Sequence, residues 1–184
     1  MHAEAYLAVR RMIQRSGINT EEPWRALDIG GAYWNGSARP ELPNADWTVI
    51  DEAEPFTDNL PPERFNHHWN QYVIADATTW RPEDGAKFDV VLCTEVFEHL
   101  ENWRAIIQTA RDVLTPRGYF IVTCASINRP EHGATGAPSP ADGEWYENVP
   151  EKHLRFELET HFKDVHVEYA YPPGDAYALA MMPR

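Results

Sequence analysis

Three aspartates stand where short apolar runs end, and their spacing points to ligand binding. Asp28 precedes Gly30 and Gly31, whereas Asp51 and Asp76 each close a run of strand length. In an open parallel sheet, ligands bind in the crevice outside the carboxyl ends of the strands. Asp51 lies 23 residues after Asp28 (51 − 28), and an acidic residue about 20 positions beyond a glycine turn can accept both hydroxyls of a ribose. One such aspartate alone would more simply cap its own loop, but three together predict a nucleoside site.

The loop after the first run argues against a phosphate-bearing nucleoside. Residues 30–36 read Gly-Gly-Ala-Tyr-Trp-Asn-Gly, which lacks the dinucleotide pattern GxGxxG. Gly31 to Ser37 imitates a phosphate-binding loop, but the lysine that neutralises phosphate is missing. Three carboxylates would also repel phosphates. They suit a cationic, phosphate-free nucleoside, and S-adenosylmethionine has these properties.

The elements that must hold these residues alternate between strands and helices. Strands are expected at 24–29, 47–50, 72–75, 88–93 and 119–124, and helices at 3–16, 100–114 and 150–162, with a truncated helix within 36–41. Pro116 and Gly118 are expected to end the helix 100–114 before the next strand begins. This alternation predicts a three-layer, Rossmann-like α/β fold with a mostly parallel sheet. The last two strands, 165–169 and 176–181, are joined by a turn too short for a parallel crossover, so we expect a C-terminal antiparallel hairpin.

The length of 184 residues predicts a single domain, 1–184. An N-terminal helix occupies part of residues 1–20. Residues 125–150 contain four prolines and three glycines without a periodic pattern, and a long irregular connection of this kind in a compact domain is usually functional or disordered. We expect this segment to form a lid or loop over the substrate.

Composition narrows the class of partner. The formal net charge of −13 disfavours a duplex-coating protein and a polybasic membrane-surface role. Nothing in the sequence approaches the ~20 consecutive apolar residues that a spanning helix needs. Cys93 and Cys124 have neither metal-ligand nor CxxC spacing, which favours reduced core thiols in a cytoplasmic protein over a disulfide or redox pair.

The order of these segments resembles a known family. Residues 24–124 look like a class I S-adenosylmethionine-dependent methyltransferase of the small-molecule branch. The resemblance is carried by residues 26–31 (Ala-Leu-Asp-Ile-Gly-Gly), 49–51 (Val-Ile-Asp), 75–77 (Ala-Asp-Ala), 88–100, which include Thr-Glu-Val-Phe-Glu-His-Leu, and 113–122. It implies S-adenosylmethionine as cofactor.

The resemblance also implies roles for individual residues. Asp28 and Gly30 would contact the methionine portion, Asp51 the ribose hydroxyls, and Asp76 with Ala77 the adenine edge. Thr94 and Glu95, just past the fourth strand, would face the transferred methyl group.

The glycine loop departs from the pattern of the family. The usual loop is DxGxGxG, and Ala32 and Trp34 stand here at its second and third glycine positions. Gly31 and Gly36 are expected to compensate through a loop of different shape. Trp34 is then free to cover the cofactor or substrate, although packing on the sheet edge explains an aromatic residue equally well.

Two histidines are candidates for the chemistry. His132, in the segment 125–150, is a possible general base, since a histidine titrates near neutral pH; the alternative is a solvated surface residue. His99 stands at a family-typical position, where it acts in catalysis or holds the start of a helix. No metal site is expected, because the adjacent His67 and His68 point apart and have no carboxylate at helical spacing.

Trp145 and Tyr146 are candidates for the acceptor pocket, with packing inside the lid as the alternative. The leading hypothesis is S-adenosylmethionine-dependent O- or N-methylation of a small-molecule acceptor. The NPPY-type segment of base-directed amino-methyltransferases is absent after the strand 88–93, which together with the charge makes nucleic acid an unlikely acceptor. A non-catalytic S-adenosylmethionine-binding sensor or partner subunit, and a methyltransferase for a macromolecular acceptor, remain open, as does the oligomeric state.

Overall fold

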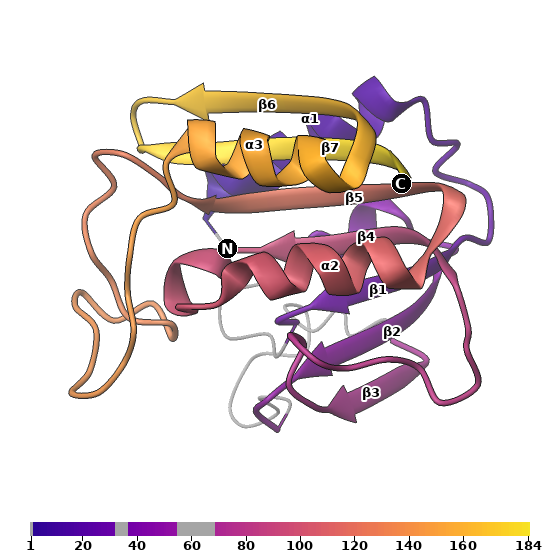
Figure 1. Ribbon diagram of the computed structural model, residues 1–184, viewed down its shortest axis with the longest axis horizontal. Coiled ribbons are helices and arrows are strands. Elements are labelled where there is room, and N and C mark those ends of the chain that lie inside the picture. The colour runs from indigo at the N-terminus through magenta and orange to yellow at the C-terminus, as the bar shows by residue number, and fades with distance from the viewer. Residues whose placement is uncertain (1, 32–36, 55–68) are drawn as a thin grey trace.

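A computed structural model describes residues 2–31, 37–54 and 69–184, and its centre is a seven-stranded sheet (Figure 1). The strand order is β3-β2-β1-β4-β5-β7-β6. The strands are β1 (Arg25–Ile29), β2 (Asp46–Asp51), β3 (Gln71–Ile74), β4 (Phe88–Thr94), β5 (Leu114–Ala125), β6 (Phe162–Ala170) and β7 (Asp175–Pro183). The helices are α1 (Ala3–Ser16), α2 (Trp103–Val113) and α3 (Glu151–His161), with short 3-10 turns η1 (Arg39–Glu41) and η3 (Phe97–His99).

The sheet is mixed in the way that the sequence predicts. Strands β3, β2, β1, β4 and β5 run parallel, whereas β7 pairs antiparallel with both β5 and β6. The mostly parallel α/β sheet with a C-terminal antiparallel hairpin is therefore confirmed. Because the first five strands are parallel, the loops that follow them gather at one edge of the sheet.

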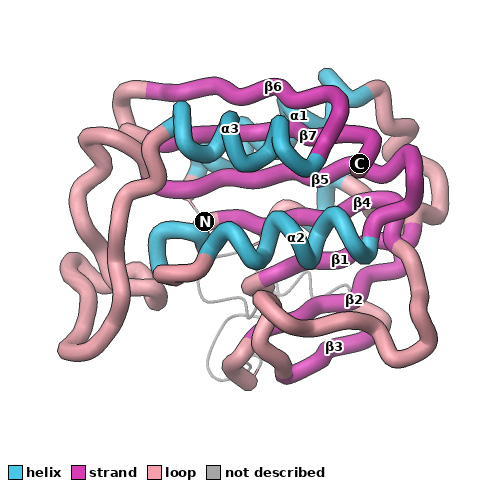
Figure 2. Tube along the Cα trace, viewed as in Figure 1, coloured by secondary structure: helices cyan, strands magenta, loops and turns pink. Residues whose placement is uncertain are grey.

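Helices cover both faces of the sheet and make three layers (Figures 1 and 2). Helices α2 and α3 lie in front of the sheet, and their apolar stripes, which include Ile106, Ile107 and Leu154, pack on one core cluster. Helix α1 lies behind the sheet and buries Val9 and Ile13 against a second cluster. Gly17 ends α1 in the left-handed conformation expected of a glycine at this position.

The predicted boundary between the helix 100–114 and the following strand is wrong. Residues 97–99 form η3, α2 ends at Val113, and β5 begins at Leu114, before Pro116 rather than after Gly118. Leu114 is buried and pairs with Phe88, and the register then shifts so that Val90 pairs with Tyr119. A bulge of this kind absorbs the proline within the strand, which is one of the few places where a sheet tolerates it.

Residues 126–150, which follow β5, contain no helix or strand. Backbone hydrogen bonds tie the segment to β5 and η3, since Val149 N donates to Ala125 O (2.9 Å) and Glu147 N donates to Glu98 O (2.8 Å). The segment thus leaves the end of β5 and returns to it. Among the described residues, no helix combines the length and the apolar character needed to cross a membrane.

Candidate functional site

A cavity of about 400 Å³ opens at the carboxyl ends of the parallel strands. It is lined by residues at or shortly after the ends of different strands, among them Gly30, Asp51, Asp76, Ala77 and Glu95. Its volume lies within the range of small-molecule pockets, roughly 300–1,000 Å³. Five of the residues predicted from sequence to hold a cofactor are therefore brought together around one space.

The two aspartates of this cavity are positioned by their own loops. Asp51 Oδ1 accepts a hydrogen bond from Ala53 N (2.9 Å), and Asp76 Oδ1 accepts from Thr78 N (2.8 Å) and Thr78 Oγ1 (2.6 Å). These are the local caps that aspartates commonly form at the ends of strands. Capping and ligand binding are compatible here, because both residues also line the cavity.

Asp28 and Gly31 are not among the described residues that line the cavity. Asp28 is 3% exposed, and its Oδ2 accepts hydrogen bonds from Arg39 Nη1 (2.6 Å) and Ser37 Oγ (3.3 Å). A Cβ at Gly31 would lie 2.8 Å from Asp28 Oδ2 and 2.7 Å from Val49 Cγ1, so glycine leaves room for the ion pair. Their cofactor contacts remain predictions. Trp34 lies outside the described residues.

Gly30 is required by the turn that follows β1. Its φ is +75°, a conformation that glycine adopts without strain. A Cβ at Gly30 would lie 2.3 Å from Val96 Cγ2, in the loop after β4. The backbone after β1 therefore approaches the β4 loop directly at the rim of the cavity.

Glu95 follows β4 in a left-handed conformation (φ 58°), which is uncommon for a residue with a side chain and concentrates at functional sites. Its carboxylate accepts a hydrogen bond from Thr123 Oγ1 (2.8 Å) and contacts His2 Nε2 at 3.3 Å. Burial pushes the pKa of Glu95 upward, but the contacts with His2 and Thr123 together outweigh burial and hold the pKa below its usual value. Thr94, the last residue of β4, is not among the described residues that line the cavity.

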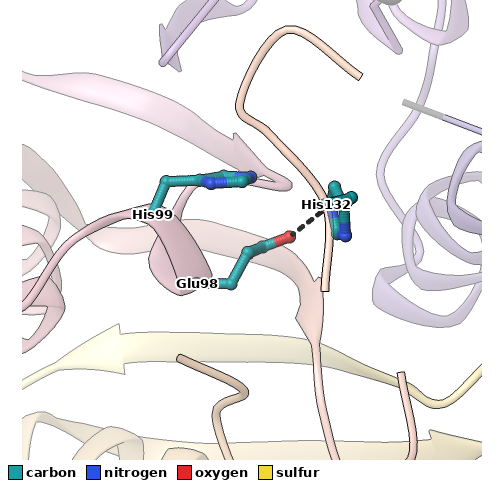
Figure 3. Close-up of side chains that lie close together, drawn as sticks. All are labelled: Glu98, His99 and His132. Carbon is teal, nitrogen blue, oxygen red and sulfur yellow. Dashed lines mark ion pairs between the residues drawn. The ribbon is translucent and has the colours of Figure 1, made fainter. Parts of the chain in front are cut away.

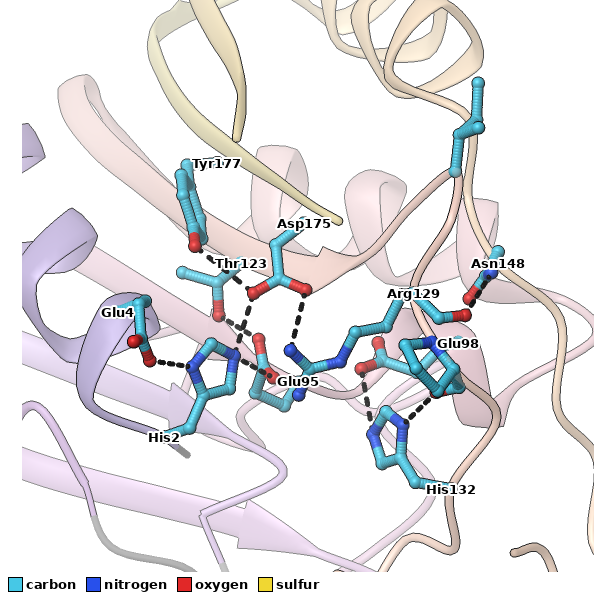
Figure 4. Close-up of polar contacts among 12 residues, drawn as sticks. His2, Glu4, Glu95, Glu98, Thr123, Arg129, His132, Asn148, Asp175 and Tyr177 are labelled. Atoms are coloured by element: carbon cyan, nitrogen blue, oxygen red, sulfur yellow. Dashed lines mark hydrogen bonds and ion pairs between the residues drawn. The ribbon is translucent and has the colours of Figure 1, made fainter. Parts of the chain in front are cut away.

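The N-terminal residue His2 belongs to a charged cluster at the rim (Figure 4). Its Nε2 lies 2.8 Å from Asp175 Oδ2, and Arg129 Nη1 lies 3.5 Å from Asp175 Oδ1. The close contacts with Asp175 and then Glu95 raise the pKa of His2 to about 10, so its ring is protonated at neutral pH. Sequence reasoning missed this cluster, because its members are far apart in the chain and show no local pattern.

His99 and His132, both predicted as catalytic candidates, lie side by side. Their rings are 5.2 Å apart, and the ring of Tyr146 lies 5.4 Å from His99 and 5.0 Å from His132. Burial and the neighbouring His132 lower the pKa of His99 to about 4, so it is neutral and a weak base at pH 7. Of this group His99 lines the cavity, as does Ala134 of the segment 125–150.

The two residues predicted to line an acceptor pocket, Trp145 and Tyr146, have different surroundings. Tyr146 packs on the histidines, and its hydroxyl donates a hydrogen bond to Asn148 Oδ1 (3.0 Å). Trp145 is 41% exposed and does not line the cavity. Glu98, next to His99, is fully buried and was missed as a candidate, although a charged residue between Phe97 and Leu100 is a visible signal.

Curated proteins match a part of the chain. A segment of 58 residues is 38% identical to the ubiquinone biosynthesis O-methyltransferase of Shewanella pealeana. The match covers 32% of this chain and 24% of the relative, so it spans about a quarter of the length of that protein.

Solved structures match nearly the whole chain in fold. The 1,6-didemethyltoxoflavin-N1-methyltransferase of Burkholderia thailandensis, solved with S-adenosylhomocysteine, has a TM-score of 0.65 at 17% identity, over 99% of this chain and 78% of its own. The N-methyltransferase NodS of Bradyrhizobium japonicum, also solved with S-adenosylhomocysteine, has a TM-score of 0.60 at 16% identity, over 96% and 86% of the two chains. At these identities the likeness concerns the fold.

A match to a protein-family model identifies the family of this chain. The model described as methyltransferase domain matches residues 1–168, which include α1, the cavity and the segment 125–150. This chain belongs to the methyltransferase domain family.

Proposed function

We propose that this protein transfers the methyl group of S-adenosylmethionine to an oxygen or nitrogen of a small-molecule acceptor. The observation that carries the proposal is the cavity at the carboxyl ends of the parallel strands, with Asp51 and Asp76 on neighbouring strand ends. The family match and the related folds solved with S-adenosylhomocysteine support the same reading.

The described residues fit the proposed cofactor. The cavity wall is acidic, since Asp51, Glu52, Asp76 and Glu95 all line it, and a cationic sulfonium compound without phosphate suits this wall. Ala53, Ala77 and Val96 add apolar surface on which a purine can rest. Asp51 would accept the ribose hydroxyls, and Asp76 with the backbone of Ala77 would meet the adenine edge.

When bound, S-adenosylmethionine supplies an electrophilic methyl carbon next to a positive sulfur. The protein must align the acceptor with that carbon and exclude water, and alignment alone can supply a large part of the rate. Glu95, after β4, would hold the cationic end of the cofactor by its carboxylate. The segment 125–150, which reaches the cavity through Ala134, would close over the acceptor.

Calorimetric titration with S-adenosylmethionine tests the cofactor assignment. A carboxylate that accepts hydrogen bonds contributes roughly 1.5–3 kcal/mol, which corresponds to about 10–100-fold in Kd. We expect a loss of this size in Asp51→Asn and none in the control Asp164→Asn, because Asp164 is exposed on β6. Wild-type affinity in Asp51→Asn would refute the ribose assignment, and no binding to the wild-type protein at ~1 mM would refute the function.

A screen of acceptors with radiolabelled methyl donor tests the transfer itself. Labelled product from hydroxyl- or amine-bearing small molecules is expected. Cofactor binding without any labelled small molecule would instead favour a sensor, or a macromolecular acceptor if a protein or RNA fraction became labelled.

We also propose a cytoplasmic location. Cys93 and Cys124 are both free and buried, which suits a reducing compartment. Cell fractionation tests this proposal, and recovery in a secreted fraction would contradict it.

A further inference from the structure

A second group of side chains lies beside the cavity and has no part in the cofactor assignment. Glu98 and His99 come from η3, directly after β4, whereas His132 comes from the segment 125–150 (Figure 3). Each of the three offers one ligand atom, and these atoms lie within 4.8 Å of one another. His132 Nε2 and Glu98 Oε1 lie 3.9 Å apart, which is too far for a hydrogen bond.

The buried carboxylate of Glu98 is a second observation that points to a ligand. Its side chain is fully buried, yet neither carboxylate oxygen has a hydrogen-bond partner among the described residues. Burying a carboxylate without a partner costs several kcal/mol, so such a group is normally paired or bound to a metal. Nδ1 of His99 is also buried without a hydrogen-bond partner in the described part of the chain.

The distances leave room for an ion between the side chains. Zinc binds histidine nitrogen and carboxylate oxygen at about 2.0–2.2 Å, so two ligands of one ion lie at most about 4.4 Å apart. The separation of 3.9 Å between His132 and Glu98 meets this limit. The remaining separations, within 4.8 Å, need a contraction of only a few tenths of an ångström.

His132 is held in the orientation that a ligand needs. Its Nδ1 lies 3.2 Å from the carbonyl oxygen of Pro130. A carbonyl oxygen can only accept, so Nδ1 carries the proton and Nε2, which faces Glu98, presents its lone pair. A backbone carbonyl on the second ring nitrogen is the usual outer partner of a metal-bound histidine.

We propose that Glu98, His99 and His132 form a site for a divalent transition metal of the zinc class at the acceptor side of the cofactor cavity. Two imidazoles and one carboxylate are a ligand set of catalytic metal sites, which keep a position open for a further ligand. His99 and Ala134 line the cavity, so the open position faces it. The ring of Tyr146 packs on both histidines.

This assignment rests on the proposed function and narrows its acceptor to a hydroxyl-bearing molecule. A divalent cation favours the deprotonated form of a hydroxyl that reaches the open position. The hydroxyl proton would leave to water, and the oxygen would form its bond to the methyl carbon as the carbon–sulfur bond breaks.

Metal binding is measured directly, on the full chain freed of metal by a chelator. Zn²⁺ is titrated in competition with a chromogenic chelator, and Co²⁺ is titrated while its visible absorption is recorded. We expect one tight site per chain, and a Co²⁺ spectrum of low coordination number. Glu98→Gln and His132→Ala should each weaken Zn²⁺ affinity by at least about 100-fold, because loss of even an outer-shell hydrogen-bond partner lowers metal affinity roughly 10–100-fold.

Two control variants separate this site from others. His153→Ala removes an exposed histidine and should leave the affinity unchanged. His2→Ala disrupts the other described group with metal-ligand spacing, His2 with Glu95 and Asp175, and should also retain tight binding. Circular dichroism of each variant establishes that it is folded.

Failure of the metal site and failure of the proposed function give different results. Absence of tight Zn²⁺ binding, or binding that survives in both Glu98→Gln and His132→Ala, overturns the metal site. The same metal-free protein is titrated with S-adenosylmethionine. Cofactor binding without metal binding overturns the metal site and supports the methyltransferase proposal. Metal binding without cofactor binding overturns the methyltransferase proposal and supports the metal site.

Discussion

The ion pair between Asp28 of β1 and Arg39 of η1 holds η1 to the sheet. We expect its loss to lower the free energy of unfolding by about 3–5 kcal/mol. The Arg39 side chain is 0% exposed and that of Asp28 is 5% exposed, with 2.6 Å between Nη1 and Oδ2. Arg39→Met keeps much of the side-chain volume but removes the charge. It therefore leaves the carboxylate of Asp28 buried without its cation, which is the costly state of a broken buried pair.

The double variant gives the diagnostic comparison. Asp28→Asn combined with Arg39→Met leaves neither charge behind, and replacing both members of a buried pair is often close to neutral. We expect its free energy of unfolding to exceed that of Arg39→Met by about 3 kcal/mol or more, because the single variant costs about 3–5 kcal/mol and the double variant is close to neutral.

Urea denaturation followed by circular dichroism measures these free energies of unfolding. Arg15→Met is the control, because Arg15 is exposed in the last turn of α1 and should change stability by less than about 0.5 kcal/mol. A cost below about 1 kcal/mol for Arg39→Met, as for an exposed pair, would show that the ion pair does not stabilise the fold as proposed. Strict additivity in the double variant would show that the two residues are not coupled.

Three further predictions concern the surroundings of the cavity. Gly30→Ala should lower the free energy of unfolding by about 2–5 kcal/mol, because left-handed strain costs about 1–2 kcal/mol and overpacking against Val96 costs about 1–3 kcal/mol. The control Gly85→Ala should show the strain alone, because Gly85 has a φ of +67° and nothing lies within 4 Å of its added Cβ. Equal costs for the two variants in urea denaturation would contradict this prediction. The pKa of His2 is raised to about 10, so the contribution of protonated His2 to folding stability is complete below pH ~6.5 and is lost as the pH rises toward 10. A difference in the free energy of unfolding between wild type and His2→Gln that stays constant over this pH window would argue against the ion pairs of His2. Burial raises the pKa of both cysteine thiols, so a chromogenic disulfide should label them slowly in the native protein and rapidly in urea, and fast native labelling would count against their burial.

The sheet and its order of elements could be predicted because each parallel strand is an apolar run and each helix has an apolar stripe. The strand Phe88–Thr94 and the helix Trp103–Val113 show this directly. The start of β5 could not be predicted, because Pro116 and Gly118 normally end a helix and separate it from the next element. Here the pairing of Leu114 with Phe88 outweighs that local preference.

The acidic edge of the cavity could be predicted from Asp51 and Asp76, since residues that follow parallel strands meet at one edge. The partner of Asp28 could not, because no local pattern links it to Arg39. The same holds for the contact of His2 with Asp175, and for that of Glu98 with His132. Contacts of this kind depend on how the loops fold over the strand ends, which hydrophobic periodicity does not encode.

A crystal structure with S-adenosylhomocysteine would show directly which residues hold the cofactor. We expect the ribose hydroxyls at Asp51, the adenine at Asp76 and Ala77, and the sulfur directed toward Glu95 and His99. A ligand bound away from the carboxyl ends of β1, β2 and β4, or a ribose without contact to Asp51, would contradict this assignment.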